Sequence, residues 1–163
     1  MHVDLFELSR NREDVAGEVP LAAMTRVDTA ERGGALRWRA RGAATPGGAA
    51  AFLLEVDGTI ALICQRCLES MVVPVSIRSR FRVVAEEREA MAIDAEDDDY
   101  DAMVGSSSFD LDALIEDEVI LALPLAPRHA ACPTSTGTPG EQRQPSSFAI
   151  LASLKSTGHT DGE

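Results

Sequence analysis

Cysteine, lysine and aromatic residues are scarce in this chain of 163 residues. It has only three cysteines, an odd and low number that does not suit the disulfide framework of a secreted domain and fits a reducing cytoplasm. Trp38, Tyr100 and five phenylalanines are its only aromatic residues, so a core has to be built mainly from Leu, Val, Ile and Ala. A single lysine stands among fifteen basic residues, which makes arginine the general cation of this chain.

Several common sequence signals are also missing. No run of about 18 apolar residues occurs, which argues against a transmembrane helix. Residues 1–8 lack the basic region and long apolar stretch of a secretory signal. The chain contains no P-loop, no G-x-G-x-x-G and no G-x-S-x-G motif. We therefore expect a cytoplasmic protein that is not an enzyme, does not bind membranes and has no small-molecule substrate.

The formal net charge is -12, but it is distributed unevenly along the chain. From Arg26 to Arg82, nine arginines accompany five acidic residues, whereas from Glu86 to Glu118 fourteen acidic residues accompany one arginine. A uniformly acidic protein would repel a phosphate backbone. A polarised one can present one part to RNA and another to a basic protein. The acidic run could equally be a solvated loop that binds nothing.

Two stretches alternate apolar and basic residues with the period of a half-buried strand. In residues 36–41, Leu, Trp and Ala alternate with three arginines. In residues 72–84, Val, Ile and Phe alternate mainly with arginines. Each predicted strand therefore has one face suited to a core and an opposite face lined with arginine.

A predicted hairpin and one further strand complete the predicted sheet. The pair Asp57-Gly58 separates the apolar runs 52–56 and 59–63, and such a pair predicts a two-residue hairpin turn. Another strand is expected near residues 24–28. Together these segments predict an antiparallel sheet over residues 24–84, one that could close into a barrel.

The clearest helix is predicted over residues 110–123. Its apolar residues fall on one broad face, Asp110 can cap its first turn, and Pro124 ends it. We expect this main helix to pack on the sheet, which gives a single α+β domain over residues 1–132. The polar stretch 86–108 is predicted to be a flexible acidic insertion in that domain.

Residues 133–163 are predicted to form a mostly disordered tail, because Thr, Ser, Gly, Pro and Gln dominate its first half. Within it, residues 148–155 form an isolated apolar segment, Phe-Ala-Ile-Leu-Ala-Ser-Leu-Lys. This docking segment either folds back on the domain or binds a partner. We favour the first, since apolar segments are usually buried within their own chain.

Two pairs of potential metal ligands share one spacing. Cys64 and Cys67 form a C-x-x-C between two predicted strands, and His129 and Cys132 form a second pair after the helix. A tight turn can direct both side chains of such a pair at one tetrahedral ion, so these four residues are a candidate zinc site. The cysteines could instead fill core positions. Thiol redox chemistry is the third alternative, although a redox C-x-x-C would open a helix rather than precede a strand.

The best candidates for RNA contact are arginines at alternate positions of the predicted strands, together with the arginine inside the C-x-x-C. Guanidinium groups at alternate positions form a row that suits successive phosphates. Exposed strand residues are commonly charged without binding anything, however, and the arginine faces of these strands lack the aromatic residues expected for base stacking. The candidates are Arg37, Arg39, Arg66, Arg78, Arg80 and Arg82.

Three blocks in the same order give the chain a family resemblance. Residues 64–68 (Cys-Gln-Arg-Cys-Leu), the helix and Ala-Leu-Pro stretch of residues 110–124, and the apolar segment 148–155 resemble the YceD family of bacteria and plastids, the large ribosomal RNA subunit accumulation proteins. The resemblance covers roughly residues 50–155. Members commonly keep a cysteine after the Ala-Leu-Pro stretch, which corresponds to Cys132.

The resemblance implies a non-enzymatic ribosome-biogenesis factor needed for the synthesis, processing or accumulation of large-subunit (23S) ribosomal RNA. Its partners would be precursor RNA, reached through the arginine faces, or basic ribosomal proteins, reached through residues 86–118. One alternative is a metal-stabilised adaptor that binds basic ribosomal proteins without touching RNA. A weaker alternative is a thiol oxidoreductase.

Overall fold

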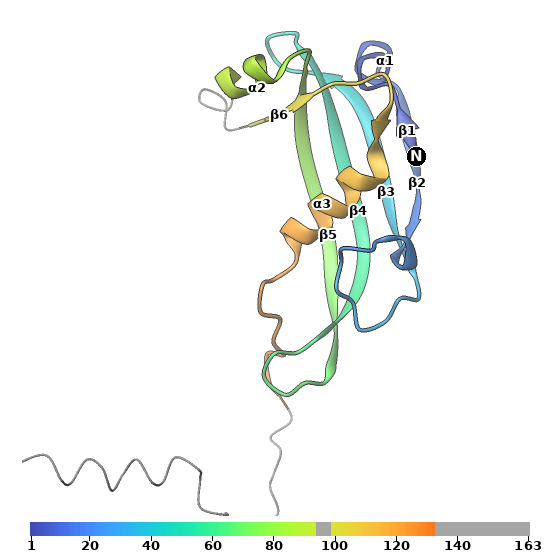
Figure 1. Ribbon diagram of the computed structural model, residues 1–163, viewed down its shortest axis with the longest axis vertical. Coiled ribbons are helices and arrows are strands. Elements are labelled where there is room, and N and C mark those ends of the chain that lie inside the picture. The colour runs from blue at the N-terminus through green and yellow to red at the C-terminus, as the bar shows by residue number, and fades with distance from the viewer. Residues whose placement is uncertain (94–98, 133–163) are drawn as a thin grey trace, which may run out of the picture. The chain divides into compact units, whose positions relative to one another are not determined.

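The computed structural model describes residues 1–93 and 99–132 (Figure 1). A five-stranded sheet with one long helix across it accounts for most of this part of the chain. The elements, in chain order, are β1 (His2–Val3), α1 (Leu5–Asn11), β2 (Asp14–Pro20), a 3₁₀ helix (Leu21–Ala23), β3 (Ala35–Ala44), β4 (Ala50–Ile63), β5 (Ser70–Val84), α2 (Glu87–Ile93), β6 (Asp101–Val104), β7 (Phe109–Asp110) and α3 (Leu111–Ala122).

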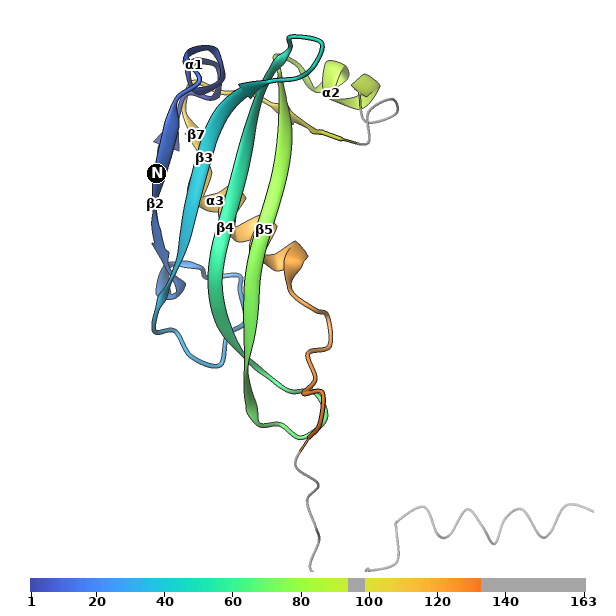
Figure 2. The same ribbon diagram turned by 180° about the vertical axis from the view of Figure 1, so that it is seen from behind.

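The main sheet has the strand order β2-β3-β4-β5-β6. Neighbouring strands are antiparallel except for β5 and β6, which are parallel. The helix α3 crosses one face of the sheet, and the opposite face is seen bare of helices in Figure 2. The prediction of an α+β fold with a largely antiparallel sheet is therefore confirmed. The sheet has two free edges and does not close into a barrel.

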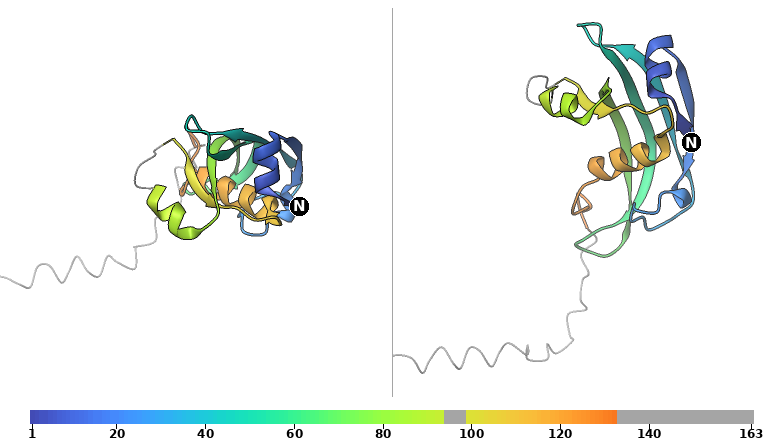
Figure 3. Two further views of the ribbon diagram at one scale, coloured as in Figure 1. Left: turned by 90° about the horizontal axis from the view of Figure 1, so that it is seen from above. Right: turned by 45° about the horizontal axis from the view of Figure 1, so that its top comes forward.

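The core lies between this sheet and α3 (Figure 3). Alternate residues of β3, β4 and β5 point into it, because successive side chains of a strand face opposite sides. Phe52 and Phe81 stack there with their ring centroids 4.9 Å apart. From α3, the fully buried residues Leu111, Ile115 and Val119 follow the spacing of one helix face. The Asp110 side chain accepts a hydrogen bond from the backbone N–H of Ala113, as predicted for a helix cap.

The predicted hairpin turn at Asp57-Gly58 is wrong, because β4 runs through both residues as a single long strand. The chain reverses earlier, between Thr45 and Ala49, where the backbone N–H groups of Thr45 and Gly48 donate to the Ala49 and Thr45 carbonyls. Gly58 is needed for a different reason. A Cβ on this residue would lie 2.6 Å from the Leu36 side chain of the neighbouring strand.

The strand predicted near residues 24–28 is also wrong. These residues follow the 3₁₀ helix as an irregular segment whose Met24 and Val27 are nonetheless buried. Arg26 between them contacts α3: its backbone N–H and Nε donate to the Glu116 carboxylate over 2.6 and 3.0 Å. The segment is therefore joined to the helix α3 and does not pair with a strand of the sheet.

The acidic stretch 86–108 contains more regular structure than the sequence indicates. It includes α2 and β6, and β6 adds a strand to the sheet beside β5. Residues 94–98 within it lie outside the described residues, as do the predicted tail 133–163 and its docking segment 148–155. Among the described helices, none is long and apolar enough to cross a membrane.

Candidate metal centre and arginine face

A tight turn joins β4 to β5 and carries the C-x-x-C. The strands end at the pair Ile63 and Ser70, and the backbone N–H of Cys64 donates to the Glu69 carbonyl over 2.9 Å. The N–H of Leu68 then returns to the Cys64 carbonyl over 3.0 Å. Leu68 closes the turn in the left-handed region with φ 63°. The turn therefore directs both thiols to one side, as the spacing predicts.

The segment that follows α3 brings the second pair of ligands to this turn (Figure 1). Cys64, Cys67, His129 and Cys132 offer ligand atoms that all lie within 4.8 Å of one another. The Sγ atoms of Cys64 and Cys132 are 3.6 Å apart, and Sγ of Cys67 is 3.3 Å from Nδ1 of His129. All three cysteines are free thiols. The four predicted ligands thus form one cluster.

Hydrogen bonds hold the two segments together around the cluster. The backbone N–H of Gln65 donates to the Pro127 carbonyl over 2.8 Å. Arg66 donates from Nη2 to the His129 carbonyl over 3.1 Å and from Nε to Sγ of Cys132 over 2.7 Å. The arginine predicted as an RNA contact is therefore engaged with the ligands and their backbone.

The donor set suits a tetrahedral zinc ion. Zinc–sulfur bonds of about 2.3 Å at tetrahedral angles place two sulfur atoms about 3.8 Å apart. The 3.6 Å separation of Cys64 and Cys132 is close to this value. Three thiols and one imidazole are also a common ligand combination of structural zinc sites. The four residues could hold such an ion without rearranging the turn.

The turn also favours the thiolate form of Cys64. Burial alone would raise the pKa of this thiol, but hydrogen bonds from the backbone N–H groups of Cys67, Arg66 and His129 lower it to about 5. The pKa of Cys67 is raised: although a hydrogen bond from the Glu69 backbone lowers it, burial and the neighbouring sulfur atoms of Cys64 and Cys132 outweigh that effect. Cys64 is therefore a thiolate at neutral pH, the form in which a cysteine binds a metal ion.

The two predicted rows of arginines lie on the same face of the sheet, opposite α3. The pairing register places Arg39 beside Glu55 and Glu55 beside Arg78, so the three form a row across β3, β4 and β5. The next row joins Arg41, Leu53 and Arg80. We call this surface the outer face. Its arginines come from β3 and β5, which β4 separates.

Acidic residues on β4 and β2 neutralise several of these arginines. Arg78 lies 3.5 Å from Glu55 and 3.0 Å from Asp57, and its hydrogen bond to Asp57 lowers the pKa of that carboxyl group. Arg41 lies 3.5 Å from Glu55, and Arg39 pairs with Asp14. The sequence analysis missed this network, because Asp57 was assigned to a turn. Had β4 been recognised as one strand, its period of two would have placed Glu55 and Asp57 on the arginine face.

Among the predicted RNA contacts on the outer face, Arg37, Arg80 and Arg82 have no ion pair with any described residue. The Nε of Arg82 is buried without a hydrogen-bond partner within the described chain. No carboxylate of the described residues forms an ion pair with these three guanidinium groups, whereas Arg39 and Arg78 each pair with one. Arg66 belongs to the metal-ligand cluster at the far end of the β4–β5 hairpin.

Comparison with protein-family models identifies a family. The sequence model of a protein family described as "Large ribosomal RNA subunit accumulation protein YceD" matches residues 53–155, which is more than half of the chain. The matched region includes Cys64, Cys67, His129 and Cys132, and it starts after β3, so that Arg37 and Arg39 lie outside it. No solved structure matches this chain.

Proposed function

Because the chain belongs to the YceD family of large ribosomal RNA subunit accumulation proteins, we propose that it is a non-enzymatic biogenesis factor that acts on precursor RNA of the large ribosomal subunit. The match over residues 53–155 carries this proposal. It contains both the four-residue cluster and the arginines of β5, so the shared part of the chain is the part with the candidate sites. The absence of a catalytic motif in the sequence is consistent with a binding role.

The metal-ligand cluster would supply the rigidity of this factor. A zinc ion held by Cys64, Cys67, His129 and Cys132 would join the end of the β4–β5 hairpin to the segment after α3. Structural zinc contributes its binding free energy to folding, because the unfolded chain has no preformed site. The cluster lies at one end of the sheet, and the ion would act as a crosslink and take no part in a reaction.

The outer face would supply the contact with RNA. Arg37, Arg80 and Arg82 present guanidinium groups that form no ion pair with a described residue on one side of the sheet. Contacts from such groups to phosphates give affinity that falls with salt concentration and does not depend strongly on sequence. The net charge of -12 opposes nonspecific binding elsewhere on the molecule and would confine RNA to this face.

An adaptor that binds basic ribosomal proteins without touching RNA is the second candidate. The observation in its favour is the neutralisation of Arg39, Arg41 and Arg78 by acidic residues of the same face. Replacing Arg80 and Arg82 with Glu separates the two candidates. An RNA-binding factor would lose affinity for large-subunit RNA fragments at low salt, while an adaptor would bind basic ribosomal proteins equally well or better.

The test of the proposed function combines two measurements. In cells that lack this protein, we expect less large-subunit ribosomal RNA relative to small-subunit ribosomal RNA, and we expect the intact protein to restore the ratio. Protein purified without chelator should contain about one zinc per chain. His129→Ala should lose the metal and fail to restore the ratio, whereas His2→Ala, on exposed β1, should behave as the intact protein. An unchanged ratio in the deficient cells would overturn the proposed function.

A further inference from the structure

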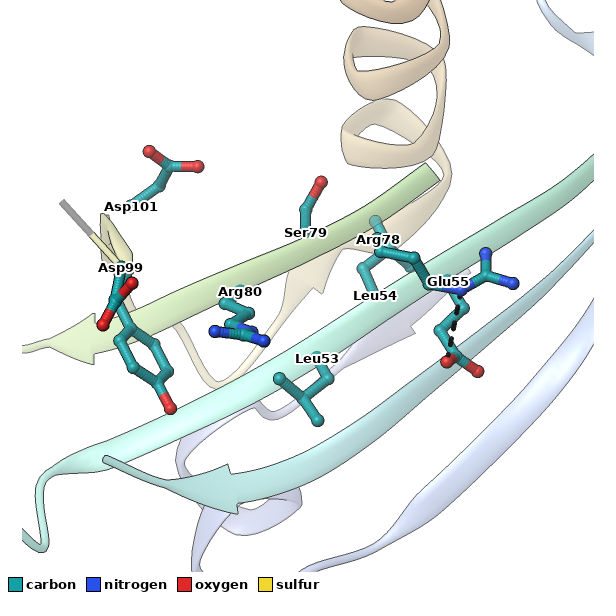
Figure 4. Close-up of a pocket in the computed structure, with 9 residues that line it drawn as sticks. Leu53, Leu54, Glu55, Arg78, Ser79, Arg80, Asp99 and Asp101 are labelled. Carbon is teal, nitrogen blue, oxygen red and sulfur yellow. Dashed lines mark ion pairs between the residues drawn. The ribbon is translucent and has the colours of Figure 1, made fainter. Parts of the chain in front are cut away.

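The outer face contains a pocket in which two predicted RNA contacts, Arg78 and Arg80, meet residues that the sequence analysis did not assign to a site. It lies between β4, β5 and residues 99–101 and has a volume of about 500 Å³ (Figure 4). Pockets of about 300–1,000 Å³ are the usual size for small molecules and single recognition groups. Tyr100, the only tyrosine of the chain, is among its lining residues. The sequence analysis found no aromatic residue beside the arginines, because Tyr100 lies about twenty residues further along the chain than Arg80.

The lining combines three kinds of group. Leu53 gives the middle of the pocket an apolar surface, and Tyr100 adds a partly exposed aromatic ring. Arg80 is exposed beside them and has no ion pair with a described residue. A planar ring, an apolar surface and an unpaired guanidinium group form a site suited to a planar ligand that carries a negative charge.

The negative and positive charges of the pocket lie in different parts of it. Figure 4 shows Asp99 and Asp101 at one end, Glu55 and Arg78 at the other, and Leu53 and Arg80 between them. At the second end, the Glu55 carboxylate is shared between Arg78 and Arg41, each 3.5 Å away, so this end is not net negative. A phosphate is therefore favoured near the arginines and disfavoured near the aspartates. The aspartate end offers acceptors for amino or hydroxyl groups.

We propose that this pocket binds one unpaired nucleotide of an RNA, with its base against Tyr100 and Leu53 and its phosphate on Arg80. Carboxylate acceptors at the aspartate end then receive hydrogen bonds from an amino group of the base or a ribose hydroxyl. A base inside a duplex cannot enter, because its faces are covered by its neighbours. The inference rests on the proposed RNA-binding function and adds to it a preference for single-stranded segments.

Fluorescence anisotropy with a labelled single-stranded RNA octamer of mixed sequence, and with the same strand in a duplex, tests this proposal. Tyr100→Ala should weaken binding of the single strand about tenfold, since stacking on an aromatic side chain contributes about 1–3 kcal/mol per base. Binding of the duplex should not change. Tyr100→Phe keeps the ring and should retain the affinity of the intact protein. Tyr100 is outside the buried core, and circular dichroism of each variant checks its fold.

A matched pair of arginine variants tests the phosphate contact. Arg80→Gln should weaken binding of the single strand and reduce the slope of log affinity against log salt by about 0.7, the value for one phosphate of a single strand. Arg88→Gln removes the same charge from α2, where the side chain pairs with Glu86 outside the pocket, and should change the slope little. Equal slopes for the two variants would overturn the phosphate assignment.

Two results would overturn the proposal as a whole. One is unchanged binding of the single strand by Tyr100→Ala. The other is that the protein binds an arginine-rich peptide tightly, loses this binding in Tyr100→Ala and does not bind single-stranded RNA. The pocket would then be a protein-binding site. Neither result affects the ribosomal RNA ratio measured in deficient cells. Conversely, the cells could show a normal ratio while the protein binds single strands in a Tyr100-dependent way. That result would support nucleotide binding by the pocket and contradict the proposed function.

Discussion

Leu68 occupies a backbone conformation that favours glycine. Its φ of 63° places it in the left-handed region, where a side chain costs about 1–2 kcal/mol. The side chain gains little in return, because 73% of the residue is exposed. The turn that carries Cys64 and Cys67 therefore stores strain at the residue that closes it.

We expect Leu68→Gly to stabilise the protein by about 1 kcal/mol, since glycine adopts this conformation without strain. Urea denaturation of metal-loaded protein gives the change in free energy of unfolding. Leu125→Gly is the control, because Leu125 is fully exposed and has no positive φ. There the substitution adds only freedom to the unfolded chain and should be slightly destabilising. Equal effects of the two substitutions would show that Leu68 is not strained.

At the scale of the element, α3 is fixed to the chain by both its apolar face and one buried carboxylate. Glu116 is 8% exposed and accepts the backbone N–H and Nε of Arg26. Burial alone would raise the pKa of Glu116, but these hydrogen bonds from Arg26 lower it below its ordinary value. A group whose pKa is lowered on folding stabilises the folded state above its unfolded pKa and loses that effect as the pH falls through the folded pKa.

Glu116→Gln should therefore destabilise the protein by about 2 kcal/mol at pH 7, the typical loss for hydrogen bonds to a charged group. The difference from the intact protein should begin to shrink as the pH falls below about 4.3, the ordinary pKa of glutamate. It should disappear below the lowered pKa of the folded state, where both proteins carry a neutral side chain. Urea denaturation at several pH values measures it. Glu87→Gln, on exposed α2, serves as a control with the same charge change. A difference independent of pH would contradict the role of the charge.

The strand β4 is the clearest case in which pairing overrides a local turn signal. Asp57 lies opposite Arg37 on one side and Ser76 on the other, so both neighbouring strands hold it in extended conformation. Gly58→Ala should destabilise by about 1–3 kcal/mol through crowding, because the new Cβ would meet the fully buried Leu36. Thermal unfolding measures the effect. Gly33→Ala has open space around it and should be neutral; a neutral Gly58→Ala would contradict the close packing.

The predictable elements are those whose evidence is local. The period of two around Trp38 and Phe81 and the period of the α3 face with its cap at Asp110 identify strands and helix within a few residues. The position of β6 was not predictable, because a four-residue strand in an acidic stretch carries no periodic signal. The irregular segment around Met24 contains buried apolar residues, and its contact with α3 is made by Arg26, far from the helix in sequence.

The candidate sites also have some features that follow from local sequence patterns and others that depend on contacts between distant segments. The spacing of Cys64 with Cys67 and of His129 with Cys132 identifies the four candidate ligands, because two residues separate the members of each pair. Their meeting depends on where α3 directs the chain, which no local pattern contains. The neutralisation of Arg78 and the approach of Tyr100 to Arg80 likewise follow from strand register and chain path.

At the scale of the whole molecule, the described chain has an apolar core at its middle and the metal-ligand cluster at one end (Figure 1). With zinc bound, chelation should loosen that end and leave the core intact, because the two are held by different interactions. Hydrogen exchange should become faster in residues 64–69 and 127–132 and stay unchanged in the central part of β4. Mass spectrometry of peptides from protein with and without chelator measures this.

His129→Ala without chelator provides the control for direct effects of the chelator and should show the same local change. Faster exchange throughout the sheet would mean that the ion supports the entire fold. Unchanged hydrogen exchange in both segments, 64–69 and 127–132, would mean that the hydrogen bond between Gln65 and Pro127 holds them together without a metal.

The position of the cluster also sets the order in which the molecule would yield to force. With an ion bound, Cys64 and Cys132 are connected through it, and a pull on the chain beyond Cys132 loads the metal–ligand bonds before it reaches α3 or the sheet. A pull from the other terminus first meets β1, α1 and β2, which hydrogen bonds, apolar contacts and exposed ion pairs hold. An unfolding machine that draws in the chain from its carboxyl side would therefore meet its strongest resistance at the first step.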